Sequence, residues 1–405
     1  MLRFLLGSPL LLATRPKKVF GETEHCEPDL SPPGEVIASP DEAINIFDFR
    51  AVAERELSAA HYALLATGVD HERGLHANRA GFGRFGLRPR FLIDVTKLDT
   101  ATEVLGTRMA CPIALAPAGM QTAFHPDGEI AVARAARSTD SLQILSTASA
   151  KSLDDVIEAR GAPVWFMLLT PKLWPLTWLQ IKRAERAGCP VLVLTVDYVG
   201  FGSQDRLRRF RGPGDPFPSV ENPECRQCHG RNVSAHVGRL LTAFGQDPIE
   251  IASDALTLDW DYVDRIRDAT SMKLVLKGIL THEDASLCLE HGVDGIIVSN
   301  HGARQIDNPR STIEVLPEIM RAVGERIPVM IDSGFRRGTD VFVALALGAS
   351  AVCVGRPYLW GLAAFGEPGV EAVLRLLRRE LATAMRHMGT PTVAAITPDF
   401  VTFLR

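Results

Sequence analysis

The sequence has few of the features that favour membrane insertion, nucleic-acid binding or a fold held by disulfides. None of its apolar runs reaches the roughly 20 residues that a membrane-spanning helix needs. The formal net charge of −4 gives no electrostatic basis for nucleic-acid binding. The seven cysteines are too few and too scattered along 405 residues to form a disulfide framework. A hydrophobic content of 46% instead indicates a chain with a sizeable core.

The N-terminal residues differ in composition from the rest of the chain. Residues 4–13 are mostly apolar and resemble the h-region of an export signal, and residues 21–40 are rich in Pro, Glu and Ser, like a flexible linker. A single preceding arginine and the lack of a clear Ala-x-Ala site argue against export. We expect either an exported, periplasmic protein or a cytoplasmic one with a disordered or mis-started N-terminus. In both cases residues 1–40 would precede one domain of residues 41–405.

Short β-rich runs alternate with amphipathic segments over most of the chain. The amphipathic segments include residues 128–137, 178–187, 282–290 and 340–347. The eight runs expected as strands are residues 113–118, 143–146, 164–169, 191–196, 273–276, 295–298, 329–331 and 351–354. This alternation predicts the α/β class and a (β/α)8 TIM barrel. A doubly wound sheet is the alternative, but it would need a G-x-G-x-x-G turn after an early strand, which is absent.

Two further segments accompany the predicted barrel. Residues 43–65 have helical spacing and predict an N-terminal helix that ends before Gly68. Residues 198–250, after the fourth strand, are rich in Gly, Pro, Arg and Asn and predict a long, mobile loop near the active site. Residues 259–268 then predict a helix that leads into the fifth strand.

Polar residues follow the predicted strands, at the face of a barrel that carries reactive groups. The sixth run, residues 295–298, leads into a Ser-Asn-His-Gly turn with His301 at its tip and Arg304 three residues later. An imidazole there suits acid–base chemistry, although a histidine in a polar loop is also common. Asp197 could fix the tautomer of such a histidine. Lys277 would be desolvated and would need an anionic partner.

Glycine-rich turns with arginines follow the last two predicted strands. Residues 332–334 (Asp-Ser-Gly) and Arg336 follow the seventh strand, and Gly355 and Arg356 follow the eighth. Loops after strands seven and eight form the usual phosphate site of barrel enzymes. Either turn alone is compatible with an ordinary loop, but together they predict a phosphate-bearing cofactor or substrate.

Residues 299–307 (Ser-Asn-His-Gly-Ala-Arg-Gln-Ile-Asp) resemble the signature of the FMN-dependent α-hydroxy acid dehydrogenase and oxidase family. Glycolate oxidase, lactate oxidase, mandelate dehydrogenase and flavocytochrome b2 belong to this family. The resemblance runs from about residue 47 to the C-terminus and includes residues 194–197, 276–278, 336–340 and 355–357. It implies an FMN-binding barrel, a homotetramer, that oxidises a 2-hydroxy acid-like substrate to the 2-oxo product. Oxygen, a quinone or a cytochrome would reoxidise the flavin.

The resemblance also implies roles for individual residues. His301 would be the base that removes a substrate proton, Asp197 would orient it, and Arg304 would bind the substrate carboxylate. Lys277 would stabilise negative charge on the flavin ring. The expected FMN contacts are Pro117, Ala118, Gly119, Ser146, Met167, Thr195, Lys277, Ser299, Asp332, Ser333, Gly334, Arg336, Gly355 and Arg356.

The substrate side departs from the family pattern. Leu64 and Leu169 stand where the family usually has tyrosines, and Gln204 stands where it has a second carboxylate-binding arginine, unless a slip in the loop brings in Arg206. Losing one such hydrogen bond costs about 1–3 kcal/mol. We therefore expect a substrate that is bulkier or less charged than glycolate. The alternative is a flavin-binding barrel that has lost this reaction and is isomerase-like or non-catalytic.

A Cys-x-x-Cys-His motif lies inside the long loop. Cys225, Cys228 and His229 have the spacing of a c-type haem attachment site, with the histidine as axial ligand. Such a haem would require export and would give the reduced flavin a one-electron outlet. A zinc site or a redox-active dithiol is the second reading, and a mobile loop without a ligand is the third. We expect no other metal site.

Overall fold

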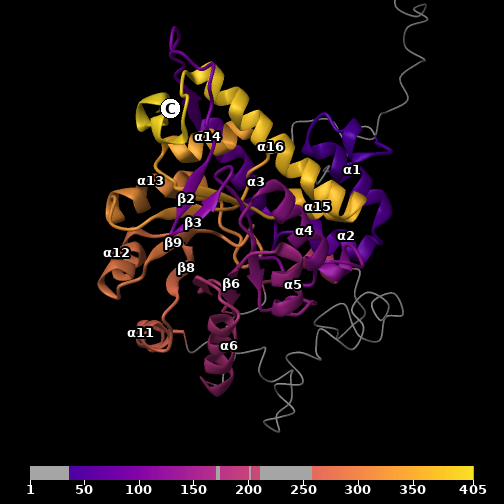
Figure 1. Cartoon of the computed structure of the whole chain (residues 1–405), viewed down its shortest axis with the longest axis vertical. Helices are drawn as coiled ribbons and strands as arrows, with labels where there is room; N and C mark the ends of the chain where they lie inside the picture. The colour runs from indigo at the N-terminus through magenta and orange to yellow at the C-terminus, as the bar shows by residue number, and fades with distance from the viewer. Residues whose placement is uncertain (1–35, 170–173, 200–201, 210–257, 405) are drawn as a thin grey trace, which may run out of the picture.

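The computed structural model describes residues 36–169, 174–199, 202–209 and 258–404 (Figure 1). Eight parallel strands form one sheet in the order β4-β11-β10-β9-β8-β7-β6-β5. These strands are β4 (Ile113–Leu115), β5 (Ile144–Ser146), β6 (Trp165–Leu168), β7 (Val191–Thr195), β8 (Lys273–Ile279), β9 (Gly295–Val298), β10 (Val329–Ile331) and β11 (Ala351–Val354). A parallel bridge between Leu115 and Gln143 joins the two edges. The sheet is thus a nearly closed barrel, and the predicted (β/α)8 architecture is confirmed.

Side chains alternate along the strands between the barrel interior and the surrounding helices. The interior holds one apolar cluster, which includes Val191, Val193, Val275, Ile297 and Met330. Extending this alternation by one step places the side chains at the carboxyl ends of the strands. The inward positions there are Ser146, Thr195, Lys277, Ser299 and Asp332. The interior is therefore apolar along most of its length and polar at one end.

A hairpin closes the other end of the barrel. It consists of β2 (Thr102–Val104) and β3 (Thr107–Met109), and Val104 and Met109 belong to the interior cluster. The Trp165 indole N–H, from inside β6, donates to Thr107 Oγ1 at 2.9 Å. With the amino end filled in this way, the carboxyl end is where a ligand can enter.

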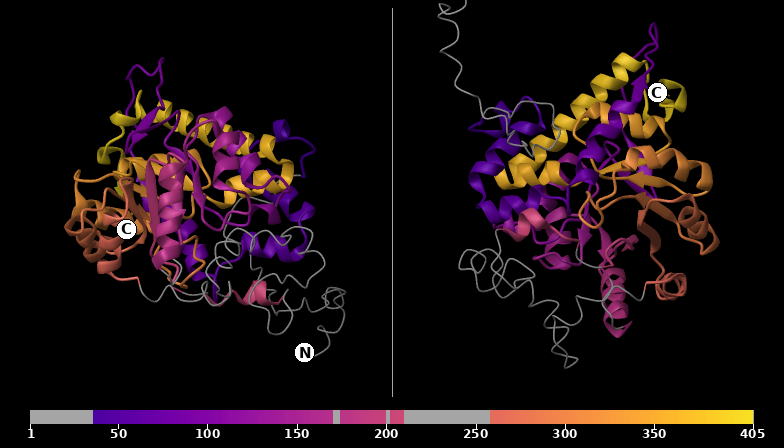
Figure 2. Two further views of the ribbon diagram at one scale, coloured as in Figure 1. Left: turned by 60° about the horizontal axis from the view of Figure 1, so that its bottom comes forward. Right: turned by 180° about the vertical axis from the view of Figure 1, so that it is seen from behind.

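Helices surround the barrel and follow its strands in sequence. They are α4 (Glu129–Thr139), α5 (Leu153–Arg160), α6 (Trp174–Arg186), α7 (Asp205–Arg208), α11 (Trp260–Asp268), α12 (His282–Glu290), α13 (Thr312–Val323), α14 (Gly338–Ala346) and α15 (Arg356–Phe365). The long C-terminal helix α16 (Glu367–Met388) packs on α4, α14 and α15 (Figure 2). Strands β1 (Phe85–Leu87) and β12 (Val401–Phe403) pair outside the barrel. Among the described helices, none has the length and apolar character required to cross a membrane.

Residues 43–65 are mostly helical, as predicted, but they do not form one continuous helix. The segment forms α1 (Ile46–Glu56) and α2 (Ala59–Ala66), followed by α3 (Arg73–Ala80). Leu57 is extended, and the Ser58 hydroxyl accepts the His61 N–H at 3.3 Å as the N-cap of α2. A serine that caps a new helix offers the backbone an alternative to continuing the old one.

The helix predicted at residues 259–268 is confirmed, and α11 begins one residue later, at Trp260. Of the long loop at residues 198–250, the structure describes only residues 198–199 and 202–209. Residues 1–35 and the Cys225, Cys228 and His229 motif lie outside the described residues.

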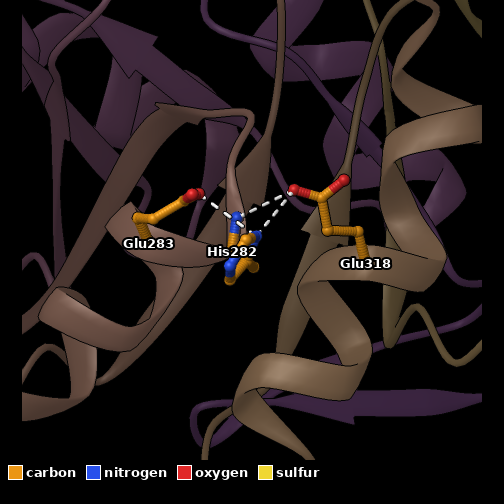
Figure 3. Close-up of side chains that lie close together, drawn as sticks. All are labelled: His282, Glu283 and Glu318. Carbon is orange, nitrogen blue, oxygen red and sulfur yellow. Dashed lines mark hydrogen bonds and ion pairs between the residues drawn. The ribbon is translucent and has the colours of Figure 1, made fainter.

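A surface cluster of His282, Glu283 and Glu318 links α12 to α13 (Figure 3). The His282 Nδ1 atom lies 3.1 Å from a Glu283 oxygen and 3.2 Å from a Glu318 oxygen. Arg310 forms an ion pair with Glu318 and compensates its charge. These contacts connect two neighbouring helices of the outer ring.

Candidate active site

His301 lies in the turn after β9 and pairs with Asp197, which follows β7. The His301 Nδ1 atom is 2.9 Å from Asp197 Oδ1. His301, Gly302 and Ala303 have φ angles of 57°, 64° and 60°, a left-handed region that histidine and alanine rarely adopt. The His301 N–H donates to Ser299 Oγ at 3.0 Å and ties the turn to the end of β9. This strained backbone, held by the bond to Ser299, directs the His301 ring toward Asp197.

Asp197 is ionised in this arrangement. Burial opposes its charge, but the Lys277 amine and the His301 ring outweigh burial and lower the pKa of the Asp197 carboxyl. An ionised Asp197 accepts a hydrogen bond from Nδ1–H of His301 and leaves the lone pair on Nε2. Gly278, with φ 114°, makes room for the pair, because a Cβ atom there would lie 2.7 Å from Asp197 Cβ.

Lys277 is a buried cation at the carboxyl end of β8. Its Nζ donates to Ser299 Oγ at 2.8 Å and lies 3.4 Å from Asp332 Oδ2. Burial disfavours the ammonium, but the Asp332 and Asp197 carboxylates overcome burial and raise the pKa of Lys277. The lysine therefore stays charged inside the mouth of the barrel, with the anionic partner that the sequence led us to expect.

Two buried oxygens at this rim have no hydrogen-bond partner among the described residues: Thr195 Oγ1 and Asp197 Oδ2. Thr195 is the register neighbour of Lys277, and both point inward. Ser146, at the end of β5, accepts the Ala148 N–H at 3.1 Å. Buried polar atoms of this kind normally bind a partner. A flat heterocycle with donors and acceptors along one edge, such as the isoalloxazine of FMN, fits this rim.

Small residues line the barrel mouth next to this rim. Pro117, Ala118 and Gly119 follow β4 and are half-buried. A Cβ atom on Gly119 would lie 2.6 Å from Ala148 Cβ, so the close packing of the loops after β4 and β5 requires glycine. The Met120 N–H donates to Ala148 O at 3.0 Å and joins these loops. The inward Met167 is buried against the interior cluster.

The turns after β10 and β11 lie beside the N-terminus of α15, which begins at Arg356. Gly334 has φ 91°, and a Cβ atom there would lie 2.2 Å from Asn78 O. Gly355 is open on its free side, since the nearest atom to a Cβ would be Ala116 Cβ at 3.9 Å. Backbone N–H groups at a helix N-terminus with open space in front bind phosphate well. This corner fits the phosphate of FMN.

Arg336 and Arg356, the arginines of these turns, donate hydrogen bonds to backbone carbonyls of the protein. Arg336 is 3% exposed, donates to Phe335 O at 3.1 Å and stacks 4.7 Å from the Trp360 ring. Arg356 donates to three carbonyl oxygens, those of Leu65, Gly302 and Thr67, each at 3.0 Å. Arg356 therefore ties α2 to the His301 turn, a role that the sequence did not predict. Ser333 and Asp332 are also joined, by a 2.6 Å hydrogen bond.

The residues predicted to face substrate come from four segments. Arg304 donates to Leu64 O at 2.7 Å and Thr67 O at 3.2 Å, at the end of α2. Leu169 packs against the interior cluster, and the Leu64 side chain is buried. Gln204 is the N-cap residue of α7.

Arg206, the alternative to Gln204 as a carboxylate ligand, instead pairs with Glu72. Its Nη1 lies 3.2 Å from Glu72 Oε2. In this structure the Arg206 guanidinium is therefore engaged by Glu72.

The structure adds Tyr198, which the sequence did not single out. Its ring centroid lies 5.9 Å from that of His301, with the planes tilted by 35°. Burial raises the pKa of the Tyr198 phenol to about 12, and the nearby Arg304 charge opposes this rise. The sequence feature that could have identified Tyr198 was its position directly after Asp197, at a strand end of the barrel.

The histidine–aspartate pair and the buried lysine at the carboxyl end of this barrel fit a flavin-dependent oxidoreductase. The sequence model described as FMN-dependent dehydrogenase matches residues 53–403. The chain belongs to this family of FMN-dependent α-hydroxy acid oxidising enzymes, and it is an FMN enzyme that oxidises 2-hydroxy acids to 2-oxo products.

Curated relatives and solved structures agree with this assignment. The chain is 38% identical over 364 residues to the peroxisomal (S)-2-hydroxyacid oxidase GLO3 of Arabidopsis thaliana, covering 89% of this chain and 97% of the relative. It is 39% identical over 373 residues to the L-lactate oxidase of Nostoc sp., covering 90% and 99%. A crystal structure of mandelate oxidase superposes with a TM-score of 0.76 at 37% identity, covering 87% of this chain and 97% of the other.

Proposed function

We propose that the enzyme prefers bulky or apolar 2-hydroxy acids, or their less charged derivatives, to glycolate. The observation that carries the chemistry is the 2.9 Å contact between His301 Nδ1 and Asp197 Oδ1, beside the buried Lys277. The preference rests on Leu64 and Leu169, which stand where the family usually has tyrosines and which the structure shows as a buried side chain and a side chain packed on the interior cluster.

His301 acts as the base in this proposal. Oxidation of a secondary alcohol to a ketone removes two protons and two electrons, and bound FMN supplies the two-electron acceptor. The lone pair on His301 Nε2 takes one of the protons, and the other would pass with the two electrons to bound FMN. Asp197 then faces an imidazolium and stabilises it across the Nδ1–H contact. Lys277 keeps a positive charge at the inner rim throughout.

The FMN contacts predicted from the sequence remain a proposal with the same residues. Thr195, Ser146 and Lys277 would hold the polar edge of the ring, and Gly334 and Gly355 would admit the phosphate. Arg336 and Arg356 would add charge to that corner. The present carbonyl partners of Arg356, at the end of α2 and at the His301 turn, would link phosphate binding to the substrate side.

The apolar substrate wall would favour a larger group on the α-carbon. Burying a side chain the size of phenyl or isobutyl against leucines contributes about 1.5–3 kcal/mol. Glycolate has no such group and depends on polar contacts alone. A mandelate oxidase variant solved with (S)-mandelic acid superposes on this chain with a TM-score of 0.74. That similarity supports an aromatic 2-hydroxy acid as a candidate substrate.

The test is anaerobic flavin reduction followed near 450 nm with glycolate, lactate, 2-hydroxyhexanoate and mandelate. We expect the ratio of the limiting rate to the dissociation constant to rise at least tenfold from glycolate to the larger acids. Equal or higher efficiency on glycolate contradicts the proposed preference. Failure of every acid to bleach the flavin would favour the other candidate, a flavin-binding barrel with a diverged or lost reaction.

The electron acceptor and location form a separate proposal. Cys225, Cys228 and His229 support a c-type haem, which requires an exported protein and gives a one-electron route out of the flavin. Covalent haem detected by mass spectrometry of the exported protein would support this. Its absence would leave oxygen or a quinone as acceptor, in the periplasm or the cytoplasm.

The proposed homotetramer predicts four chains per particle by light scattering.

A further inference from the structure

Tyr198 is held next to the proposed base by the end of β7. The ladder between β7 and β8 continues past the strand, since the Val196 N–H donates to Lys277 O at 2.9 Å. Asp197 is fixed by His301, and Tyr198 follows at once. Its ring lies 5.9 Å from the His301 ring. The phenol is therefore placed by two neighbouring strands.

A positive charge acts on the same phenol. Arg304 lowers the pKa of Tyr198 against the rise that burial causes, so the guanidinium and the phenol are within electrostatic range. Arg304 is itself held by Leu64 O and Thr67 O. Because the pKa of the phenol stays at about 12, Tyr198 is a protonated donor at neutral pH.

An imidazole and a phenol thus lie together at one side of the barrel mouth, from the segments after β9 and β7, and the Arg304 guanidinium acts on the same phenol. Leu64 and Leu169, also predicted to face substrate, offer no hydrogen-bond donor there. A 2-hydroxy acid places its carboxylate one bond from the carbon whose oxidation needs the base. When the reacting carbon of the substrate lies at His301, its carboxylate is therefore within reach of Tyr198 and Arg304.

We propose that Tyr198 donates its phenolic hydrogen to the substrate carboxylate and, with Arg304, determines the affinity for acids over neutral analogues. This inference rests on the proposed function, because it assigns the carboxylate subsite of the same site. The competing role for Tyr198 is packing alone, in which its ring supports His301 and its hydroxyl contributes nothing to binding.

The experiment measures binding without turnover. Phenylacetate and phenylacetamide lack the hydroxyl that is oxidised and differ only at the carboxylate. Their dissociation constants are measured by calorimetry on the FMN-loaded full chain, for the wild type, Tyr198→Phe, Tyr198→Ala and Tyr62→Phe. Tyr62 is the matched control, since its phenol accepts a hydrogen bond from Arg50 Nε at 3.2 Å, a contact between α1 and α2.

We expect Tyr198→Phe to weaken phenylacetate binding about tenfold or more, as for a lost hydrogen bond to a charged group, and to leave phenylacetamide within twofold. Tyr62→Phe should change neither constant. Unchanged phenylacetate binding in Tyr198→Phe overturns the inference, and a loss confined to Tyr198→Ala assigns the packing role.

The two proposals fail separately. If no hydroxy acid reduces the flavin while phenylacetate binding still depends on the Tyr198 hydroxyl, the carboxylate subsite stands and the proposed oxidation fails. If hydroxy acids reduce the flavin while Tyr198→Phe binds phenylacetate as the wild type does, the oxidation stands and the role of Tyr198 fails.

Discussion

The Asp197→Asn substitution tests how much the enzyme depends on the charge behind His301. The two groups are in direct contact at 2.9 Å, and charge centres about 4 Å apart interact by about 4 kcal/mol at an effective dielectric constant near 20. An asparagine amide would also donate to Nδ1 and move the proton to Nε2. Losing about 4 kcal/mol predicts a fall of about three powers of ten in the rate of flavin reduction.

The assay is anaerobic stopped-flow reduction by mandelate, with FMN content and thermal stability measured on the same sample. Asp264→Asn is the matched control, because Asp264 Oδ1 lies 2.9 Å from His291 Nδ1 in an equivalent pair between α11 and α12. It should leave the rate unchanged. A fall of less than tenfold in a correctly folded, FMN-loaded Asp197→Asn enzyme would refute the reasoning.

Three further variants follow from the structure. If Leu64 faces substrate as proposed, Leu64→Tyr should raise efficiency on glycolate relative to mandelate in the reduction assay. Gly278→Ala forces a Cβ against Asp197 at φ 114° and should cost about 1–3 kcal/mol in chemical denaturation as well as slow flavin reduction. Burial opposes the charge of the Glu185 carboxylate, but hydrogen bonds from Lys182, Ser271 and Thr270 favour it. They lower the pKa of Glu185 from 4.5 to about 2. A lowered folded-state pKa gives stability that is complete above pH 4.5 and lost toward pH 2. Glu185→Gln should therefore reduce stability by about 1 kcal/mol at pH 7, after allowing for solvent screening, and flatten its acid dependence in thermal melts.

The barrel strands were predictable because buried parallel strands are continuous β-branched runs. The predicted bounds of β9, β10 and β11 match the structure, and the runs at residues 273–276 and 143–146 differ from β8 and β5 only at their ends. The break in the N-terminal helical segment was not predicted, since the apolar spacing continues through Ser58, where a capping hydroxyl starts a new helix.

The site was predictable where its chemistry lies at strand ends. His301, Asp197 and Lys277 each follow or end a strand, and the barrel brings them together. The bonds from Arg304 and Arg356 to the end of α2 could not be read from the sequence, because their acceptors are backbone carbonyls more than 230 residues away. Carbonyl groups carry no residue-specific signal.

The most direct test of the central claim is flavin reduction by the His301→Asn variant. Asparagine can keep a donor toward Asp197 while it removes the Nε2 lone pair that takes the substrate proton. With FMN bound as in the wild type, reduction at saturating mandelate should fall by about two to four powers of ten, the usual contribution of a positioned base. Reduction within tenfold of the wild-type rate would contradict the assignment of His301 as the base.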